Sequence, residues 1–452
     1  WLRADGTFEV RLNGVPLRLT SEWPGTPVTR LRPTALRELA GRGEVSELQG
    51  SAPASKDSGA SRARRAAALL TRSPLTRARY KEAWVLMDRV HDADDSGERL
   101  FRYLRDNRPT INAWFVLEKG VPDWDRLVAD GYGSRLIAYG GGAWKSVLMN
   151  AKHLISSHID KPVHNPPGMA GLPHDWTFTF LQHGVIKDDL SNWLNSKRLD
   201  LFVTSTPAEH ASIVEDGSPY VFTDHEVKLT GLPRFDRQRA LGEEIAPDAR
   251  DLLLVAPTWR HWLTGPLEPG SQRRAARSDF LETQYAQQWL GLLRSPRLAQ
   301  LCRDERLTLG FLPHPNLQSI LETLQLPTHV KALTFHGQDV QRLFARSALM
   351  VTDYSSMVFN AAYIERPVVY FQFDQERMFG GSHVGRAGYF SYERDGFGPV
   401  VNSVDAAVEA TVDALAAGRR APADEYLARI NATFPLRDGR CCERVTAAIE
   451  AL

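Results

Sequence analysis

The stretch Ala348-Leu349-Met350-Val351-Thr352-Asp353-Tyr354-Ser355-Ser356 decides the fold of this chain. Its first four apolar residues predict a buried strand, and small hydroxyl residues follow that strand directly. Residues 357–364 then have the pattern of a helix, and residues 367–371 form a second apolar strand. The first N–H groups of such a helix are unpaired and attract negative charge, so the segment predicts an anion site. The alternative is that Asp353 and the two serines only cap the helix.

The same alternation of apolar strands with helices extends through most of the chain. Helices are expected between the strands, for example over residues 97–106, 283–293 and 316–324. Short apolar strands that alternate with helices indicate parallel sheets covered on both faces. We therefore predict an α/β chain with two doubly wound domains, residues 61–240 and 241–452, which face each other across a cleft. The further strands are predicted at residues 83–87, 113–117, 135–138, 153–155, 178–181, 199–203, 227–229, 252–257 and 307–312.

Residues 1–60 precede these domains and are predicted to be a short β-rich extension and linker. Alternation over residues 8–15 predicts a hairpin with an Asn-Gly turn, and residues 50–62 have the Ser/Ala/Gly composition of a linker. Because the first residue is not methionine, the extension is interpreted as the tail of an upstream module. The basic segment 62–80 fits two interpretations equally, a helix on an anionic membrane surface and a helix packed on the domain.

Composition places the chain among ordinary soluble proteins. The 452 residues carry a formal net charge of +1, so the overall charge does not indicate a nucleic-acid partner. No apolar run approaches the roughly 18 residues that a membrane-spanning helix needs. The three cysteines do not form a disulfide framework, which favours a reducing, cytoplasmic compartment. The absence of GxGxxG and GxxxxGK[ST] motifs argues against an ordinary dinucleotide or P-loop enzyme.

Polar side chains follow four further predicted strands, at the strand ends where ligands bind in such sheets. A histidine precedes a glycine at the first end, an arginine lies in a Gly-x-Pro-Arg turn at the second, another arginine follows a proline at the third, and a histidine lies between two prolines at the fourth. Each has a structural alternative: a buried histidine, an interdomain turn, an ordinary surface arginine and an incidental histidine. The candidate residues at these ends are Gln182, His183, Gly184, Lys187, Asp188, Arg234, Thr258, Arg260 and His314.

Taken with Ser355 and Ser356, these ends offer a base, cations and hydroxyl groups around one cleft. That inventory suits phosphoryl transfer, which depends mainly on positioning and on neutralising charge. The histidines are far apart in sequence, and neither HExxH nor CxxC occurs, so no metal site is predicted.

The strand-end motifs resemble those of the CDP-glycerol:poly(glycerophosphate) glycerophosphotransferase family, which includes teichoic acid polymerases and capsule relatives. The resemblance covers residues 80–450 and includes the segments 84–89, 94–97 and 101–104 near its start. The motifs, in chain order, are Gln182-His183-Gly184, Gly231-Leu232-Pro233-Arg234, Ala256-Pro257-Thr258-Trp259-Arg260, His314-Pro315 and Thr352-Asp353-Tyr354-Ser355-Ser356.

The resemblance implies a GT-B fold, in which two Rossmann-like domains face a cleft and the second binds the nucleotide. It implies a metal-independent transfer of glycerol phosphate from CDP-glycerol to a hydroxyl of a cell-wall or capsule polymer, with release of CMP. His183 is then the general base, and His314 is the second catalytic residue. The donor-binding residues implied are Arg234, Thr258, Arg260, Asp353, Ser355 and Ser356, and those on the acceptor side are Gln182, Gly184, Lys187 and Asp188.

The expected partners are a CDP-activated alditol and a lipid-linked or polymer acceptor, with no separate cofactor and no nucleic acid. The expected location is the cytoplasm, at the inner face of a bacterial membrane. The chain has Gln182 where the family often has Trp, and Val185-Ile186 where it often has Thr-Pro, so acceptor identity stays open. The alternatives are a GT-B transferase that uses CDP-ribitol or a nucleotide sugar, a non-catalytic lipid- or polymer-binding module, and a sugar epimerase.

Overall fold

The computed structural model describes residues 7–12, 15–20, 73–164, 166, 175–267, 274–276, 279–317, 324–335, 338–382, 386–418 and 420–452. The chain divides into two compact units, Trp1–Leu70 and Thr71–Leu452. In the first unit, β1 (Thr7–Leu12) pairs antiparallel with β2 (Val15–Thr20), which confirms the predicted hairpin. The Asn-Gly turn, the linker and the basic segment up to residue 72 lie outside the described residues.

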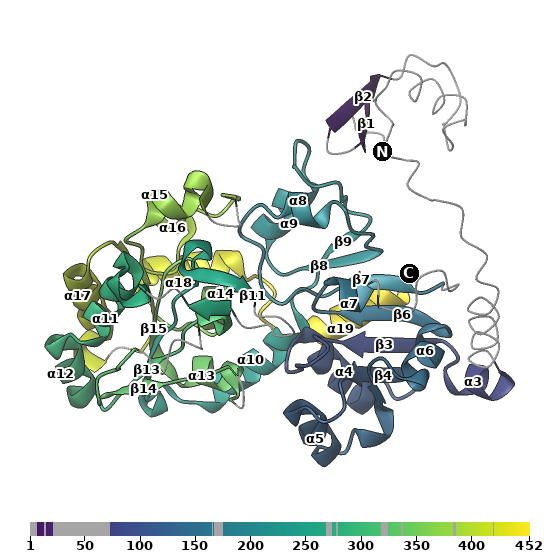
Figure 1. Ribbon diagram of the computed structural model, residues 1–452, viewed down its shortest axis with the longest axis horizontal. Helices are drawn as coiled ribbons and strands as arrows, with labels where there is room; N and C mark the ends of the chain where they lie inside the picture. The colour runs from purple at the N-terminus through teal and green to yellow at the C-terminus, as the bar shows by residue number, and fades with distance from the viewer. Residues whose placement is uncertain are drawn as a thin grey trace. The chain divides into compact units, whose positions relative to one another are not determined.

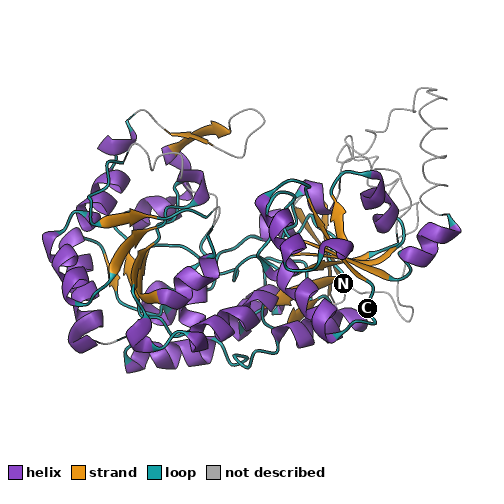
Figure 2. Cartoon of the chain, turned by 90° about the horizontal axis from the view of Figure 1, so that it is seen from below, coloured by secondary structure: helices purple, strands orange, loops and turns teal. Residues whose placement is uncertain are grey.

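The second unit contains two parallel sheets, each with helices on its faces, as Figures 1 and 2 show. Each sheet together with its helices is called a lobe, and the lobes are numbered in chain order. This confirms the predicted pair of doubly wound domains. The strands consist almost entirely of buried apolar residues because helices cover both sides of each sheet. Among the described residues, no helix is both long and apolar enough to cross a membrane.

The first sheet has seven strands in the order β5-β4-β3-β6-β7-β8-β9. All six neighbouring pairs are parallel, so the carboxyl ends of the strands lie along one edge. Its strands are β3 (Ala83–Met87), β4 (Ala113–Leu117), β5 (Leu136–Ala138), β6 (Ala151–Ser156), β7 (Thr177–Phe180), β8 (Leu201–Thr204) and β9 (Val227–Leu229). The helices of this lobe are α3 (Pro74–Arg79), α4 (Ser96–Asn107), α5 (Pro122–Ala129), α6 (Gly142–Leu148), α7 (Lys161–His164), α8 (Ser191–Leu194) and α9 (Pro207–Val214).

The second sheet has six strands in the order β14-β13-β10-β15-β16-β17, again all parallel. Its strands are β10 (Leu252–Val255), β13 (Thr308–Phe311), β14 (Val330–Ala332), β15 (Ser347–Thr352), β16 (Val368–Phe371) and β17 (Val400–Val401). A separate hairpin joins β11 (Thr264–Leu267) to β12 (Arg274–Ala276). The sequence did not predict β14, β17 or this hairpin, because these strands are short and lack a long apolar run. The helices are α11 (Gln284–Leu293), α12 (Pro296–Asp304), α13 (Val340–Arg346), α14 (Val358–Tyr363), α15 (Gln375–Arg377), α16 (Tyr392–Asp395), α17 (Val404–Leu415) and α18 (Asp424–Thr433).

Two helices tie the lobes together. Helix α10 (Pro233–Glu244) leads from the first lobe to the second, and α19 (Cys441–Glu450) returns to pack on α4, α10 and β8 of the first lobe. In Figure 1 the yellow α19 lies beside the dark blue end of the first sheet. Asp236 of α10 fixes the start of α19, because its two carboxylate oxygens accept hydrogen bonds of 2.8 Å from Cys441 N and Cys442 N. The last helix of the predicted domain 241–452 therefore packs on the first lobe.

Candidate active site

Two histidines stack at the carboxyl edge of the first sheet. His183 follows β7 and His158 follows the neighbouring strand β6. Their ring centroids lie 4.8 Å apart with an interplanar angle of 19°. His158 is buried, whereas His183 is exposed. His158 was not among the predicted site residues, although its position just after a strand is the same signal that identified His183.

The environment of this pair disfavours the charged form of both rings. The pKa of His183 is lowered, mainly because the surrounding protein limits hydration of a charged ring, while Asp95 acts in the opposite direction. Burial, reinforced by the nearby His183, lowers the pKa of His158 well below its usual value. A neutral imidazole with an exposed face can accept a proton from a substrate hydroxyl.

A buried carboxylate holds the loop that carries His183. Glu209, in the first turn of α9, accepts hydrogen bonds from Ile186 N and Ser205 N, both at 2.7 Å. Gln182 has a positive φ of 63°, and its side chain donates to Val203 O at 2.6 Å and to Glu209 at 3.2 Å. The assignment of Gln182 to the acceptor side needs correction, because its buried side chain supports the loop from behind.

The pair Lys187 and Asp188 is also engaged within the protein. Lys187 is buried, and its Nζ lies 2.6 Å and 2.8 Å from the two carboxylate oxygens of Asp188. The same ammonium lies 5.5 Å from the ring centre of Tyr392 in the second lobe. Lys187 is therefore a buried contact between the lobes, which corrects the expectation that it presents its charge to the acceptor.

The carboxyl edge of the second sheet is organised around a buried arginine. Arg260, after β10, is fully buried and pairs with Asp353, after β15, at 2.9 Å and with Asp374, after β16, at 2.8 Å. Its Nη1 also donates to Thr258 O at 2.8 Å, and the ring of Tyr354 lies 4.9 Å away. The carboxylates keep the pKa of Arg260 above its usual value despite burial. The expectation of an exposed Arg260 is wrong, because two carboxylates from other strand ends enclose it.

The ion group formed by Arg260, Asp353 and Asp374 fixes the loops that carry the other predicted donor-side residues. Asp353 accepts a hydrogen bond of 2.8 Å from Thr258 N, so it joins the loops after β10 and β15. Ser355 is buried, and its hydroxyl accepts from Met357 N at 3.2 Å, whereas Ser356 is only half-buried. Asp353 and Ser355 thus shape the turn before α14, but they do not cap this helix, whose N-cap residue is Met357 and which has no side-chain cap hydrogen bond. Ser356 has the more accessible hydroxyl of the two serines.

His314 has a fixed orientation on the loop after β13. Its Nδ1 accepts a hydrogen bond of 3.2 Å from Asn316 N, which places the proton of the neutral ring on Nε2. The imidazole centre lies 6.0 Å from that of Trp259, which belongs to the loop after the adjacent strand β10. His314 and the Arg260 group therefore occupy the same edge of the second sheet.

The two sheet edges meet at Gly184. A Cβ atom at this position would lie 3.3 Å from the Ser356 hydroxyl and 4.0 Å from Nη2 of Arg234. Arg234 begins α10, and its guanidinium reaches back to Asp95 of the first lobe at 3.3 Å. The structure thus brings together three predicted site regions: the His183-Gly184 loop, Arg234 and Ser356.

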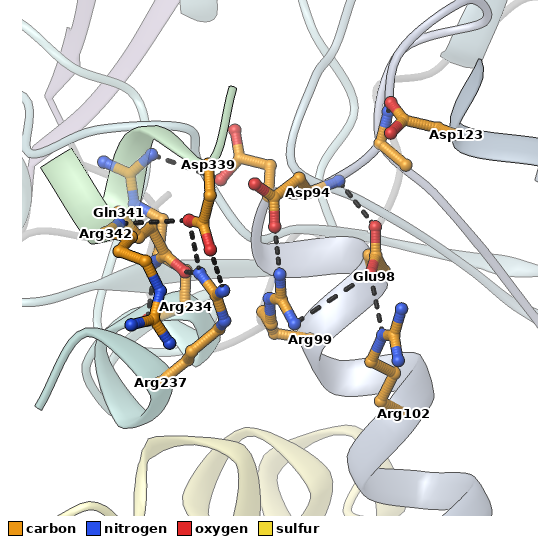
Figure 3. Close-up of polar contacts among 12 residues, drawn as sticks. Asp94, Glu98, Arg99, Arg102, Asp123, Arg234, Arg237, Asp339, Gln341 and Arg342 are labelled. Carbon is orange, nitrogen blue, oxygen red and sulfur yellow. Dashed lines mark hydrogen bonds and ion pairs between the residues drawn. The ribbon is translucent and has the colours of Figure 1, made fainter. Parts of the chain in front are cut away.

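Arg234 also borders a polar network between the lobes, which Figure 3 shows. Its backbone carbonyl accepts a hydrogen bond of 2.9 Å from Gln341, and one turn later Arg237 pairs with Asp339 at 2.9 Å. On the other side, Glu98 of α4 binds Arg102 and Arg126 within the first lobe. The contacts from Asp339 and Gln341 fix this side of α10 against α13, whereas the Glu98 contacts stabilise α4 within the first lobe.

No group of three or more His, Cys, Asp or Glu residues that could hold a metal ion is present in the described part of the second unit or in the hairpin.

Comparisons with known proteins agree with this geometry. The model of the family CDP-Glycerol:Poly(glycerophosphate) glycerophosphotransferase matches residues 69–451. The minor teichoic acid biosynthesis protein GgaB of Bacillus subtilis (strain 168) is 28% identical over 376 residues, which is 82% of this chain and 40% of GgaB. The teichoic acid ribitol-phosphate polymerase TarL of Staphylococcus aureus (strain NCTC 8325 / PS 47) is 23% identical over 224 residues, 49% of this chain and 36% of TarL. The chain thus matches less than half the length of either relative.

The structure of the wall teichoic acid polymerase TagF superposes on this chain with a TM-score of 0.59 and 16% identity, and covers 87% of this chain and 94% of that one. TagF has also been solved as a histidine variant soaked with CDPG. At this identity the superposition establishes the fold, a GT-B arrangement of two parallel sheets, as predicted.

We predict that Arg260→Ala destabilises the protein by about 3–5 kcal/mol, because it leaves Asp353 and Asp374 buried without their cation. The free energy of unfolding from urea titration measures this effect. Arg377→Ala is the matched control: Arg377 is exposed and lies 4.4 Å over the Trp262 ring, so we expect a loss of about 0.5–1 kcal/mol. Equal losses for the two variants would contradict the structural role of the ion group.

Proposed function

Because the chain belongs to the CDP-glycerol:poly(glycerophosphate) glycerophosphotransferase family, we propose that it transfers glycerol phosphate from CDP-glycerol to a hydroxyl of a growing cell-wall polymer and releases CMP. The observation that carries this proposal is the meeting of the two sheet edges. His183 lies next to Gly184, where an added Cβ would lie 3.3 Å from the Ser356 hydroxyl and 4.0 Å from Arg234 Nη2. A base from one lobe and phosphate-binding groups from the other are thus close enough to act on one substrate.

In the proposed reaction, the acceptor hydroxyl attacks the phosphorus atom that carries glycerol. A new P–O bond to the acceptor forms, the P–O bond to CMP breaks, and His183 takes the hydroxyl proton. Negative charge grows on the leaving CMP, where we place Arg234, His314 and the Ser356 hydroxyl. Arg260 and Asp353 act by fixing the loops that carry Thr258, Ser355 and Ser356, since their charges are satisfied by one another.

The donor assignment is supported by relatives. A TagF variant soaked with CDPG, and the description of the matched family, both favour a CDP-activated glycerol. TarL is a ribitol-phosphate polymerase, so CDP-ribitol is the main alternative donor for this chain. We propose a lipid-linked or polymer acceptor, and action at the inner face of the cell membrane, where such acceptors are made.

The proposal is tested by measuring the CMP that the purified protein releases from CDP-glycerol. With CDP-glycerol and a glycerol-phosphate-primed acceptor we expect CMP, and we expect little without the acceptor. CDP-ribitol is the matched donor because it changes the alditol alone, and a UDP-sugar, from which a sugar transferase would release UDP, tests the sugar-transferase alternative. Acceptor-dependent release of UDP from the UDP-sugar, without release of CMP from either CDP donor, would replace the proposal with a sugar transferase. A lack of both release and donor binding would favour a non-catalytic module.

We predict that His183→Ala lowers turnover by about 10²–10⁴-fold and leaves CDP-glycerol affinity nearly unchanged, because it removes the base and not a donor contact. Initial CMP-release rates and calorimetric titration measure the two quantities. His225→Ala is the control, since His225 is exposed on the loop before β9 and we expect normal turnover. Wild-type turnover in His183→Ala would remove His183 from the mechanism.

A further inference from the structure

Asp95 lies beside the histidine pair and has no role in the reaction proposed above. It is the N-cap residue of α4, and its Oδ1 accepts hydrogen bonds from Ser96 N at 2.7 Å and from Arg234 Nη1 at 3.3 Å. Its Oδ2 lies 3.8 Å from Nε2 of His158, the ring that stacks on His183. One carboxylate therefore contacts a helix start, a cation of the cleft and the buried histidine.

The position of Asp95 is rigid because a second carboxylate anchors the same helix start. Asp88, buried at the end of β3, accepts hydrogen bonds from the backbone N–H groups of Asp95, Gly97 and Glu98 at 2.8–3.1 Å. A Cβ atom at Gly97 would lie 2.5 Å from Met87 O, so only glycine allows the helix to approach the strand this closely. The Asp95 carboxylate therefore keeps its place relative to the strand ends that carry both histidines.

We propose that Asp95 is a positioning residue of the reaction, which holds Arg234 through Oδ1 and places its negative charge beside the stacked histidines, so that His183 is a stronger base. This inference rests on the proposed role of His183 as the general base. The arrangement follows the general logic of a base that a third group supports. It differs in that the carboxylate acts on the base through its charge and through Arg234, without a bond to the base.

Charged groups from four elements act on His183. Arg89 follows β3, Asp160 follows β6, Asp95 is the N-cap residue of α4, and Arg234 lies in the first turn of α10. The surrounding protein lowers the pKa of His183 most, the two arginines lower it as well, and Asp95 and Asp160 raise it. Removing the charge of Asp95 therefore lowers the pKa of His183 further and makes it a weaker base.

A purely structural role for Asp95 would be to cap α4, and Asp95→Asn separates the two roles. Asparagine caps a helix as well as aspartate does but carries no charge. Asp339→Asn is the matched control. Asp339 is the N-cap residue of α13, accepts from Arg342 N at 3.0 Å, and pairs with Arg237 of α10 within the network of Figure 3. Both variants remove the charge of a capping aspartate that binds an α10 arginine, and only Asp95 faces His158.

We predict that Asp95→Asn lowers turnover by about 10–100-fold and moves the acid limb of the kcat/KM profile to lower pH, while Asp339→Asn leaves both nearly unchanged. Proton NMR titration measures the titration midpoint of the His183 ring without substrate, and the His183→Asn variant identifies the signal of this ring. There we expect a lower midpoint in Asp95→Asn than in the wild type.

Asp95→Ser, which also retains a capping side chain, repeats the test if Asp95→Asn does not fold. An unchanged His183 midpoint together with an unchanged acid limb would overturn the proposal and leave Asp95 as a cap only. The NMR titration distinguishes this failure from failure of the proposed function, because the midpoint is measured whether or not the protein releases CMP.

Discussion

The close approach of Gly184 to Ser356 is the constraint on which the whole site depends. In a parallel sheet the side chains available for chemistry leave from the carboxyl ends of the strands, so a two-sheet enzyme must bring two such edges together. Here the two edges approach closely, since a Cβ added at Gly184 would lie 3.3 Å from the Ser356 hydroxyl. In the proposed reaction, this approach lets the base of the first lobe and the hydroxyl groups of the second reach one substrate.

The buried charged side chains discussed here stabilise loops, and we propose that more accessible side chains bind the ligand. Glu209 secures the His183 loop, and Arg260 with its two aspartates secures three strand ends of the second lobe. Such buried groups are costly unless each is paired, and here each is satisfied by backbone or by an opposite charge. His183, Arg234 and Ser356 are more accessible than these buried groups. In the proposed reaction, this division supplies the fixed, pre-oriented charges that phosphoryl transfer requires.

The strands were predictable because burial on both faces demands continuous apolar runs, as in residues 83–87 and 113–117. The strand-end rule also located His183, Arg234 and Ser356 correctly at the meeting edges. The roles of Arg260, Lys187 and Gln182 were not predictable, because each depends on a partner far away in sequence or on the direction of one side chain. His158 lies just after a strand, so the strand-end rule could have found it. Asp95 gains its proposed role only from the packing of α4 against β3 and β6, which brings its carboxylate within 3.8 Å of His158.

The most direct test of the account is a structure of the protein with CDP-glycerol bound. We predict that the diphosphate lies between the loops after β10, β13 and β15, with Ser356 and Arg234 in contact and the glycerol-bearing phosphorus directed at the face of His183. A nucleotide bound on the first lobe, or a phosphorus atom with Gly184 and Ser356 both distant from it, would contradict the central claim that the two sheet edges form one phosphoryl-transfer site.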